Sequence, residues 1–476
     1  MQSTPPPVRR DDILTLTIDH VAFEGKAVAR LDGFVVFVEG AVPGDTVLAK
    51  VFRTKKQFAE ARVIEVLESS PHRVTPACAH FGTCGGCKWQ HLSYEQQLLW
   101  KERNVRESYE RLGGFPDVCV RPTVPSEHVF FYRNKMEFSF AAKRWLLPHE
   151  VGTIAPGDEL FALGLHAPGR YDKVLRIEAC HLQSEESNAI LNATRVFFEE
   201  QGLTAWDSDL MNGTLRNLVI REGRHTGDRM VYLLTSGLDE NVLAAYADQL
   251  RAPQFGVTTF VHGLSRKKAQ VATAETMRVV FGEGLIRDSI GGAVFEVSPL
   301  SFFQTNTLQA ERLYSVAAGY ADLRDTDDVW DLYCGTGTIA LYLASRVHSV
   351  LGIELNAAAV LDAQANALRN GIGNARFACA DILHFAREAA TGALPAPSRI
   401  ILDPPRAGLH PSIIPALAPL RVPRIVYVSC NPATSARDCA VFAEHGYMID
   451  EITPVDMFPH TFHIECVVSL SLRSAD

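Results

Sequence analysis

The chain has 476 residues, of which 47% are hydrophobic and 21% charged, as in ordinary globular proteins. No apolar run is long enough to cross a membrane, and the N-terminal segment lacks the apolar core of a signal peptide. The net charge of −9 excludes a chain that is basic throughout, so any contact with nucleic acid requires local basic patches. We expect a cytoplasmic protein of two or three domains, preceded by a disordered tail over residues 1–10.

The first predicted domain covers residues 11–69 and is a small β-barrel. β-rich runs at 13–18, 34–38, 46–52 and 61–67 alternate with glycine turns. Short strands at this spacing are typical of oligonucleotide-binding barrels. A basic run at 53–56 lies in one predicted loop, where charge alone indicates a solvated turn.

Three cysteines follow in one glycine-rich loop, with the spacing C-x5-C-x2-C: Cys78, Cys84 and Cys87. The two glycines between the last pair let the backbone fold closely around sulfur. Without an export signal, a disulfide framework is disfavoured and a metal centre is favoured. The alternative is that these are unpaired structural cysteines.

A fourth ligand would have to come from elsewhere in the chain. Cys119 and Cys180 are both candidates, and we prefer Cys180 because it follows a predicted strand. Four cysteines suit either zinc or an iron–sulfur cluster. Zinc sites usually pair two short knuckles, whereas here one three-cysteine loop joins one distant cysteine, so a [4Fe–4S] cluster is favoured.

Residues 70–297 are predicted to form a mixed α+β domain that carries this loop. An amphipathic helix is expected over 93–112, with Ser93 as N-cap and a glycine pair as the stop, and it is expected to pack on the catalytic domain. Residues 131–138 alternate aromatic with basic side chains, which suits base stacking and phosphate contact. Taken alone, such a stretch is more often half-exposed strand surface.

Residues 298–476 are predicted to form a doubly wound, Rossmann-like α/β domain. A strand at 329–333 leads into a Gly-Thr-Gly loop and a helix, and the next strand ends in Glu354. An acid about 20 residues after the first glycine can bind ribose hydroxyls. A dinucleotide is the competing ligand, but the loop lacks a third glycine.

Two further acids favour S-adenosylmethionine as the cofactor. Asp331 precedes the glycine loop, where it fits a ligand with a cationic amino-acid tail. Asp381 stands at the end of a third strand and could accept a hydrogen bond from an adenine amino group.

Two more strands end in polar, proline-stopped segments: Asp403-Pro404-Pro405-Arg406 and Ser429-Cys430-Asn431-Pro432. Proline cannot continue a strand, and open α/β sheets bind ligands at the carboxyl ends of their strands. A lone cysteine is by default a small buried hydrophobe. Two such strand ends in series favour a site instead, with Cys430 at its centre.

The third chemical candidate is Glu465, in an apolar and aromatic context near the C-terminus. Burial raises the pKa of a carboxyl group, which suits a proton acceptor. The alternative is a paired glutamate at a strand edge.

Together these motifs resemble the RNA uracil-C5 methyltransferase family over nearly the whole chain. They are the cysteine loop, Ser298-Pro299-Leu300-Ser301-Phe302-Phe303-Gln304-Thr305-Asn306, Asp331-Leu332-Tyr333-Cys334-Gly335, Asp403-Pro404-Pro405-Arg406, Ser429-Cys430-Asn431-Pro432 and His463-Ile464-Glu465. The barrel resembles a TRAM module, an RNA-binding fold. The resemblance implies an S-adenosylmethionine-dependent enzyme that acts on structured RNA, ribosomal rather than transfer RNA, and we expect it to be a monomer without membrane contact.

The resemblance also implies roles for individual residues. Cys430 would be the nucleophile and Glu465 the general base. The cofactor would be bound by Gln304, Tyr333, Thr338, Glu354, Asp381 and Asp403. The cluster would be bound by Cys78, Cys84, Cys87 and Cys180.

The chemistry explains these residue types. Uracil C5 is a poor nucleophile, and thiolate addition at C6 turns the ring into an enolate that can attack a methyl sulfonium. A base must then remove the C5 proton, and the target base must leave its stack to be reached. Three alternatives stay open: a transfer-RNA enzyme, a non-catalytic iron–sulfur RNA-binding protein, and a methyltransferase acting on an exocyclic nitrogen. The last would need no cysteine, and such enzymes often have an aromatic residue where Arg406 stands.

Overall fold

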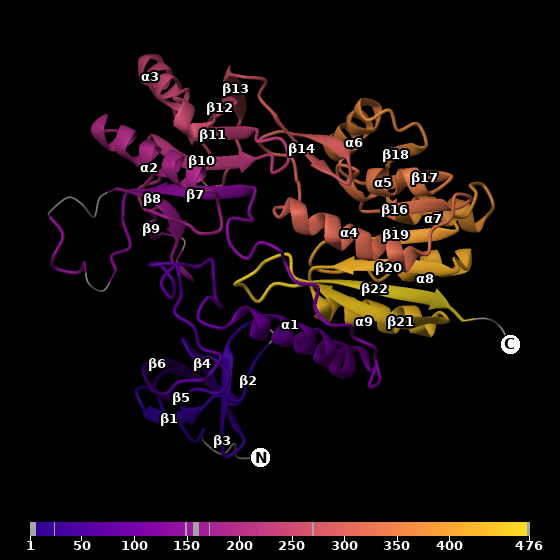
Figure 1. The fold of residues 1–476 in the computed structure, drawn as a ribbon, viewed down its shortest axis with the longest axis horizontal. Coiled ribbons are helices and arrows are strands. Elements are labelled where there is room, and N and C mark those ends of the chain that lie inside the picture. Colours follow the sequence, from indigo (N-terminus) through magenta and orange to yellow (C-terminus); the bar gives the residue numbers. More distant parts are fainter. Residues whose placement is uncertain are drawn as a thin grey trace.

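The computed structural model describes residues 6–22, 24–147, 150–155, 161–170, 172–268 and 271–473. The chain forms an N-terminal β module, a central α+β domain and a C-terminal α/β domain (Figure 1). Residues 1–5 of the predicted tail lie outside these ranges, but Val8 is 1% exposed within the N-terminal core. In the ranges described, none of the helices combines the length and hydropathy needed to cross a bilayer.

The N-terminal module is a six-stranded sheet in the order β1-β5-β6-β4-β3-β2. Its strands are β1 (Ile13–Thr17), β2 (His20–Val21), β3 (Ala27–Leu31), β4 (Phe34–Glu39), β5 (Thr46–Thr54) and β6 (Phe58–Glu68). Alternate side chains of β4 and β5, such as Val36, Val38 and Val47, bury one face in a common core. The four predicted strands are present, and β2 and β3 are additional. In this order β1 and β2 are the two edge strands, so closure into a barrel stays a prediction.

Helix α1 (Tyr94–Ser108) connects this module to the C-terminal domain. It continues into a π-helical turn (Tyr109–Gly113) and ends at Gly114, whose φ of 73° favours glycine. Ser93 precedes the helix but makes no side-chain cap. The helix packs against α9 (Pro432–Glu444), where the Tyr109 hydroxyl lies 2.6 Å from Ser435 Oγ. The chain after α1 then runs beside β21, through bridges at Val120 and Val124.

The central domain is a seven-stranded sheet in the order β13-β12-β11-β10-β7-β8-β9. Its core contains aromatic side chains from the sheet and from α2 and α3, including Phe138, Phe198 and Tyr246, all fully buried. The elements are β7 (Lys135–Ala141), β8 (Ala162–His166), β9 (Val174–Arg176), α2 (Glu185–Glu200), β10 (Leu215–Glu222), β11 (Arg229–Thr235), α3 (Glu240–Leu250), a 3₁₀ turn (Pro253–Phe255), β12 (Thr259–Leu264) and β13 (Thr276–Phe281).

The C-terminal domain is a second seven-stranded sheet, in the order β18-β17-β16-β19-β20-β22-β21. Strands β18 to β20 are parallel, whereas β22 is antiparallel to both of its neighbours. The elements are α4 (Thr307–Ala321), β16 (Asp328–Leu332), α5 (Thr338–Leu343), a 3₁₀ turn (Ala344–Arg346), β17 (Ser349–Glu354), α6 (Ala357–Arg369), β18 (Ala375–Cys379), α7 (Ile382–Ala390), β19 (Arg399–Leu402), α8 (Ile413–Leu417), a 3₁₀ turn (Ala418–Leu420), β20 (Arg424–Ser429), α9, β21 (Tyr447–Val455) and β22 (Glu465–Leu472).

Two features of this domain position the site. The chain runs outward from β16 to β18 and then returns to β19 on the other side, so a topological switch point lies between β16 and β19. A hairpin, β14 (Ile286–Ile290) and β15 (Ala293–Val297), packs into the same hydrophobic core. This core therefore begins before residue 298, the expected boundary, because the apolar faces of the hairpin are buried against α4 to α6.

Candidate active site

A cavity of about 770 Å³ lies at the carboxyl ends of β16, β19 and β20. Both predicted catalytic residues line it, Cys430 and Glu465. Five of the six predicted cofactor residues also line it: Gln304, Tyr333, Thr338, Glu354 and Asp403. These side chains come from positions as far apart in the sequence as 304 and 465, and the fold brings them together at one topological switch point.

Asp381 lies apart from this lining. Its side chain accepts a hydrogen bond of 2.9 Å from the Leu383 backbone, so that it caps the N-terminus of α7. It remains close enough to Tyr333 to contribute to the raised pKa of that phenol, after the larger effect of burial.

Strand pairing brings Cys430 and Glu465 together. Cys430 directly follows β20, and Glu465 opens the antiparallel neighbour β22. The last pair of the ladder is Ser429 with Cys466, and Cys430 and Glu465 are the next residues beyond it on the two strands. Both line the cavity, and Glu465 is near enough to raise the pKa of the Cys430 thiol. A thiol and a carboxyl group therefore face the cleft side by side.

The nucleophile candidate is protonated in the resting site. Burial, followed by the neighbouring Glu465 and Asp403, raises the pKa of Cys430 to about 11, and Arg406 opposes them. A thiol is a nucleophile only as its thiolate. Arg406 is thus the nearby charge that favours the reactive form.

Two buried acids, Asp331 and Glu465, and the half-buried Asp403 lie around the cleft. Burial raises the pKa of Asp403 to about 7. Burial and the nearby Asp403 raise the pKa of Asp331 to about 8. Glu465 is 6% exposed, and burial followed by Asp403 raises its pKa well above the usual range. A site in which several carboxyl groups hold their protons is suited to receive a cationic ligand, which would favour their ionised forms.

The glycine loop after β16 has a defined shape. A Cβ atom at Gly337, whose φ is 80°, would lie 2.8 Å from the Phe377 ring, so only glycine fits there. Glu354 is held by backbone amides, accepting 2.8 Å bonds from Leu355 and Asn356 and a 3.2 Å bond from Gly335. This carboxylate is fixed at the strand end, where a ribose could be bound.

The loop that carries Arg406 is held by α9. Asn431 caps α9 through its side-chain oxygen and donates through Nδ2 to the Arg406 carbonyl at 3.2 Å. Asp438, which is 3% exposed, accepts 2.8 Å bonds from the Leu409 amide and the Tyr427 hydroxyl. The nucleophile loop and the Arg406 loop are therefore built as one unit.

Three cleft residues were not assigned roles from the sequence. Arg406 was noted only as the end of a motif, although its charge acts on both Cys430 and Glu465. His463 lines the cleft, and burial lowers its pKa to about 4, so it is neutral at physiological pH. Tyr314 on α4 lies 2.9 Å from the Thr338 hydroxyl, a contact for which the sequence holds no local signal.

The four predicted cluster ligands line a second cavity, of about 610 Å³: Cys78, Cys84, Cys87 and Cys180. Burial, with a smaller contribution from the other thiols, raises the pKa of Cys87 to about 12 and that of Cys180 to about 11. The thiols are thus within electrostatic reach of one another. Among the residues described, however, no three His, Cys, Asp or Glu side chains form a group that could hold a metal ion. Cys119, the other candidate, is exposed beside β21.

The chain is similar over nearly its whole length to RNA methyltransferases. It is 43% identical over 469 residues to an uncharacterized RNA methyltransferase of Chlorobaculum tepidum, with 96% of each chain covered. A protein of the same description from Bacteroides thetaiotaomicron is 39% identical over 95% of this chain and 100% of its own length. The structure also resembles the Pyrococcus abyssi tRNA (uracil-54, C5)-methyltransferase in complex with S-adenosyl-L-homocysteine. That match has a TM-score of 0.74 and 29% identity and covers 96% of this chain and 99% of the other.

Two family matches cover the N-terminal and C-terminal parts of the chain. Residues 8–64 match the TRAM domain, which corresponds to the N-terminal sheet. Residues 270–473 match the tRNA (Uracil-5-)-methyltransferase family and contain the whole cleft apart from Arg133. The chain is therefore an RNA methyltransferase, and it belongs to the RNA uracil-C5 methyltransferase family.

Proposed function

We propose that this enzyme methylates C5 of a uridine in RNA, with S-adenosylmethionine as methyl donor, through a covalent bond between Cys430 and C6. The pair of Cys430 and Glu465 in one cleft carries this proposal. The pair supplies a nucleophile for C6 and a base for the C5 proton, which is the minimum that the reaction requires.

The cleft suits the proposed cofactor. Asp331, which is fully buried beside the cleft and does not line it, has an Oδ1 without a hydrogen-bond partner among the described residues and would favour a cationic amino-acid tail. Glu354 would hold ribose hydroxyls, and Gln304, Tyr333, Thr338 and Asp403 line the remaining space. Asp381 would act only from the rim, because it caps α7. S-adenosylmethionine supplies an electrophilic methyl group when bound.

The proposed steps balance in atoms and electrons. The Cys430 thiol gives its proton to solvent and the thiolate bonds to C6, so that the C5–C6 π electrons shift onto C5 and the adjacent carbonyl oxygen. C5 would then attack the methyl carbon of the sulfonium, whose C–S bond breaks with its electron pair left on sulfur, so that a neutral thioether leaves. Glu465, ionised once the cationic ligand is bound, accepts the remaining C5 proton, the C–H electrons restore the double bond, and the C6–S bond breaks to release the thiolate. One methyl group has replaced one proton.

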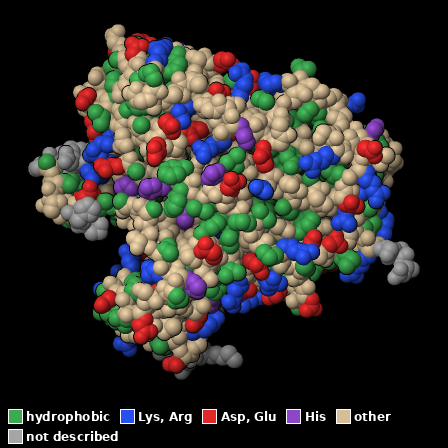
Figure 2. Space-filling view, viewed as in Figure 1, with side chains coloured by type: hydrophobic (Ala, Val, Ile, Leu, Met, Phe, Trp, Pro, Cys, Tyr) green, Lys and Arg blue, Asp and Glu red, His purple; other side chains and the backbone are tan. Residues whose placement is uncertain are grey.

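Structured ribosomal RNA, bound by a monomeric enzyme, is the proposed substrate. Basic side chains line both cavities: Arg133 borders the two, and Lys135 and Arg221 line the cysteine cavity. On the face in Figure 2, Lys and Arg are interspersed with Asp and Glu, so such local groups would carry the phosphate contacts. Transfer RNA is the second candidate, favoured by the substrate of the archaeal relative. Mapping 5-methyluridine in both RNA classes, from cells with and without the gene, distinguishes them.

We also infer that Cys78, Cys84, Cys87 and Cys180 bind a [4Fe–4S] cluster. Their convergence on one cavity and their thiolate-forming chemistry support a shared centre. The four thiols do not form a group that could hold a metal ion among the described residues, so binding the cluster would require them to move closer together.

The covalent step is tested with RNA that contains 5-fluorouridine. Fluorine cannot leave C5 as a proton does, so the adduct should persist on a denaturing gel when enzyme, cofactor and RNA are mixed. Cys430→Ser should abolish it, whereas Cys379→Ser, which changes an exposed cysteine at the end of β18, should not. An equal yield of adduct from Cys430→Ser would refute the assignment.

A further inference from the structure

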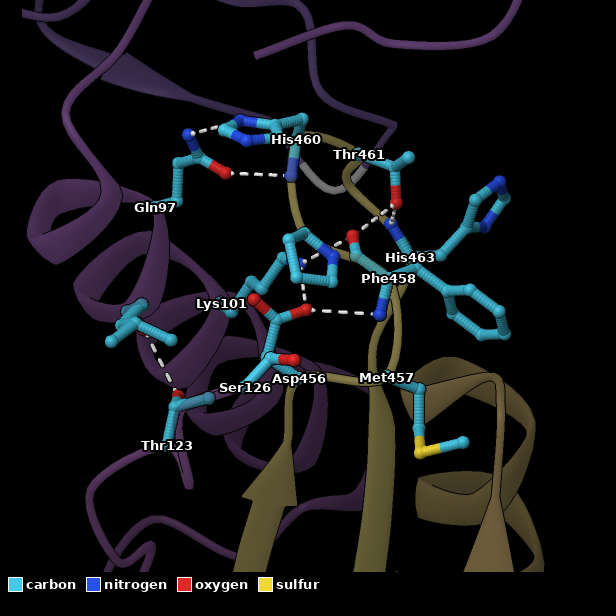
Figure 3. A network of polar contacts seen from close by, with 12 residues as sticks. Gln97, Lys101, Thr123, Ser126, Asp456, Met457, Phe458, His460, Thr461 and His463 are labelled. Carbon is cyan, nitrogen blue, oxygen red and sulfur yellow. Dashed lines mark hydrogen bonds and ion pairs between the residues drawn. The ribbon is translucent and has the colours of Figure 1, made fainter. Parts of the chain in front are cut away.

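The loop that joins β21 to β22, residues 456–464, leads directly into Glu465 and contacts several distant parts of the chain (Figure 3). One is α1, which precedes the central domain in sequence and packs on the catalytic domain. A second is the segment directly after the cysteine loop. The position of Glu465 therefore depends on contacts made outside its own sheet.

The first contact is a buried ion pair. Lys101 on α1 and Asp456 at the start of the loop both have fully buried side chains, and Nζ lies 2.5 Å from Oδ1. Lys101 also donates to the Phe458 carbonyl at 3.1 Å, and Asp456 accepts from the Phe458 amide at 3.1 Å. A buried ion pair often stabilises a fold no better than apolar side chains would, but it tolerates only one geometry. The ion pair between Lys101 and Asp456 therefore contributes more to the position of the loop than to the stability of the fold.

The second contact holds His460. The Gln97 side chain accepts from the His460 amide at 2.9 Å and lies 3.2 Å from its ring nitrogen Nδ1. The His460 carbonyl accepts from the amides of Lys88 and Trp89, at 2.8 and 3.0 Å. His460 has a φ of 65°, a left-handed conformation that is costly for this residue and persists where surrounding contacts impose it.

The contacts continue to the catalytic base. Thr461 donates to the Phe458 carbonyl at 2.8 Å, and its hydroxyl accepts from the His463 amide at 3.2 Å. Glu465 is two residues further on. A short, hydrogen-bonded path therefore joins Lys101 and Gln97 to the base.

We propose that Lys101 and Gln97 are positioning residues, which hold loop 456–464 so that Glu465 faces C5 of the uracil ring. The inference rests on the proposed function, because it concerns the step in which Glu465 removes the C5 proton. It also gives the cysteine loop a role in catalysis, since Lys88 and Trp89, which directly follow Cys87, hold the same loop at His460.

The test separates methyl transfer from product release. Asp456→Asn breaks the ion pair with little change of volume, and Gln97→Met removes the second contact independently. Each variant should bind RNA with wild-type affinity and transfer the methyl group in a single turnover. Release should slow by about 10- to 100-fold, because misplacing a catalytic group by about 1 Å can cost about 10²-fold in rate. Covalent enzyme joined to methylated natural RNA should accumulate.

Arg399→Met is the matched control. Arg399 and Asp327 form a largely buried ion pair, with N–O distance 3.4 Å, at the amino end of β19 and away from the cleft. Its loss should lower stability without accumulation of the adduct. Release at the wild-type rate in both Asp456→Asn and Gln97→Met, or failure of both before methyl transfer, would overturn the inference. Wild-type enzyme that forms no 5-methyluridine would instead refute the proposed function.

Discussion

The guanidinium of Arg406 lowers the pKa of the Cys430 thiol, against burial and two neighbouring carboxyl groups. Arg406→Gln should therefore reduce the thiolate fraction and slow formation of the 5-fluorouridine adduct near neutral pH. Arg406 is exposed, so a loss of about 1.4- to fivefold is expected, corresponding to about 0.2–1 kcal/mol. Rapid-quench gels report the rate. Arg376→Gln, an exposed change on β18, should leave it unaltered, and an equal loss in both variants would contradict this role.

Glu465→Gln should block the last step while leaving the earlier ones intact. The amide keeps the size of the side chain but cannot accept the C5 proton, so turnover should fall by about 10²–10⁴-fold. Methylated, natural-uridine RNA should remain covalently bound to Cys430, as a denaturing gel with labelled methyl groups would reveal. Turnover at the wild-type rate, or a defect before methyl transfer, would make Asp403 the next candidate base.

Buried acids should make the ligand-free enzyme less stable as pH rises. The pKa of Asp331 is about 8 in the folded protein, far above its ordinary value near 4, so the folded state keeps a proton that the unfolded state loses. The contribution of Asp331 to the free energy of unfolding is fully present below about pH 4. It falls progressively up to about pH 8, by at most about 1.4 kcal/mol per pH unit. Urea unfolding at pH 5 and pH 8 measures the loss. Asp331→Asn keeps the 2.9 Å acceptor for the Ala340 amide and should reduce the pH dependence; an unchanged dependence would contradict this assignment.

Asp438→Ala should disturb the Arg406 loop as well as the fold. It leaves the Tyr427 hydroxyl and the Leu409 amide without their 2.8 Å acceptor, a cost of about 1–3 kcal/mol in unfolding free energy. The Cys430 adduct should form more slowly, because the loop is released from α9. Tyr427→Phe removes only one of the two donors, so it should lower the unfolding free energy and the rate of adduct formation by less than Asp438→Ala does. A larger loss in Tyr427→Phe would exclude this account.

Anaerobically purified enzyme should be brown and contain iron and sulfide. Replacing Cys180 by serine should remove both, whereas replacing the exposed Cys119 should not. Zinc without iron in such a preparation would overturn the cluster assignment. Through the contacts at His460, loss of the cluster should also slow product release more than methyl transfer.

Local patterns in the sequence predicted the strands that carry the site. Expected strands at 329–333 and 349–353 correspond to β16 and β17, because apolar β-branched runs that end at glycine or proline are local signals. Asp381 illustrates the limit of such signals. The sequence places it after a strand, like Glu354, but its side chain caps the following helix.

The sequence did not predict which distant segments of the chain pair with one another. Nothing near Glu465 indicates that β22 inserts antiparallel beside β20, yet this pairing brings Glu465 into the same cleft as Cys430. The docking of Tyr109 against Ser435 and the pairing of Lys101 with Asp456 likewise join segments more than 320 positions apart. Such contacts form only in the assembled fold and produce no periodic pattern in the sequence.

The burial of Lys101 against Asp456 has a consequence for how this protein is made. The two residues are 355 positions apart, so the nascent helix α1 leaves the ribosome long before its partner loop is synthesised. Until then its lysine and the Tyr109 ring have no native site to occupy. Vectorial synthesis can complete the N-terminal sheet early, but closure of the catalytic domain must await the last-made strands. A chain truncated before β21 would keep a folded RNA-binding module attached to an unfinished enzyme.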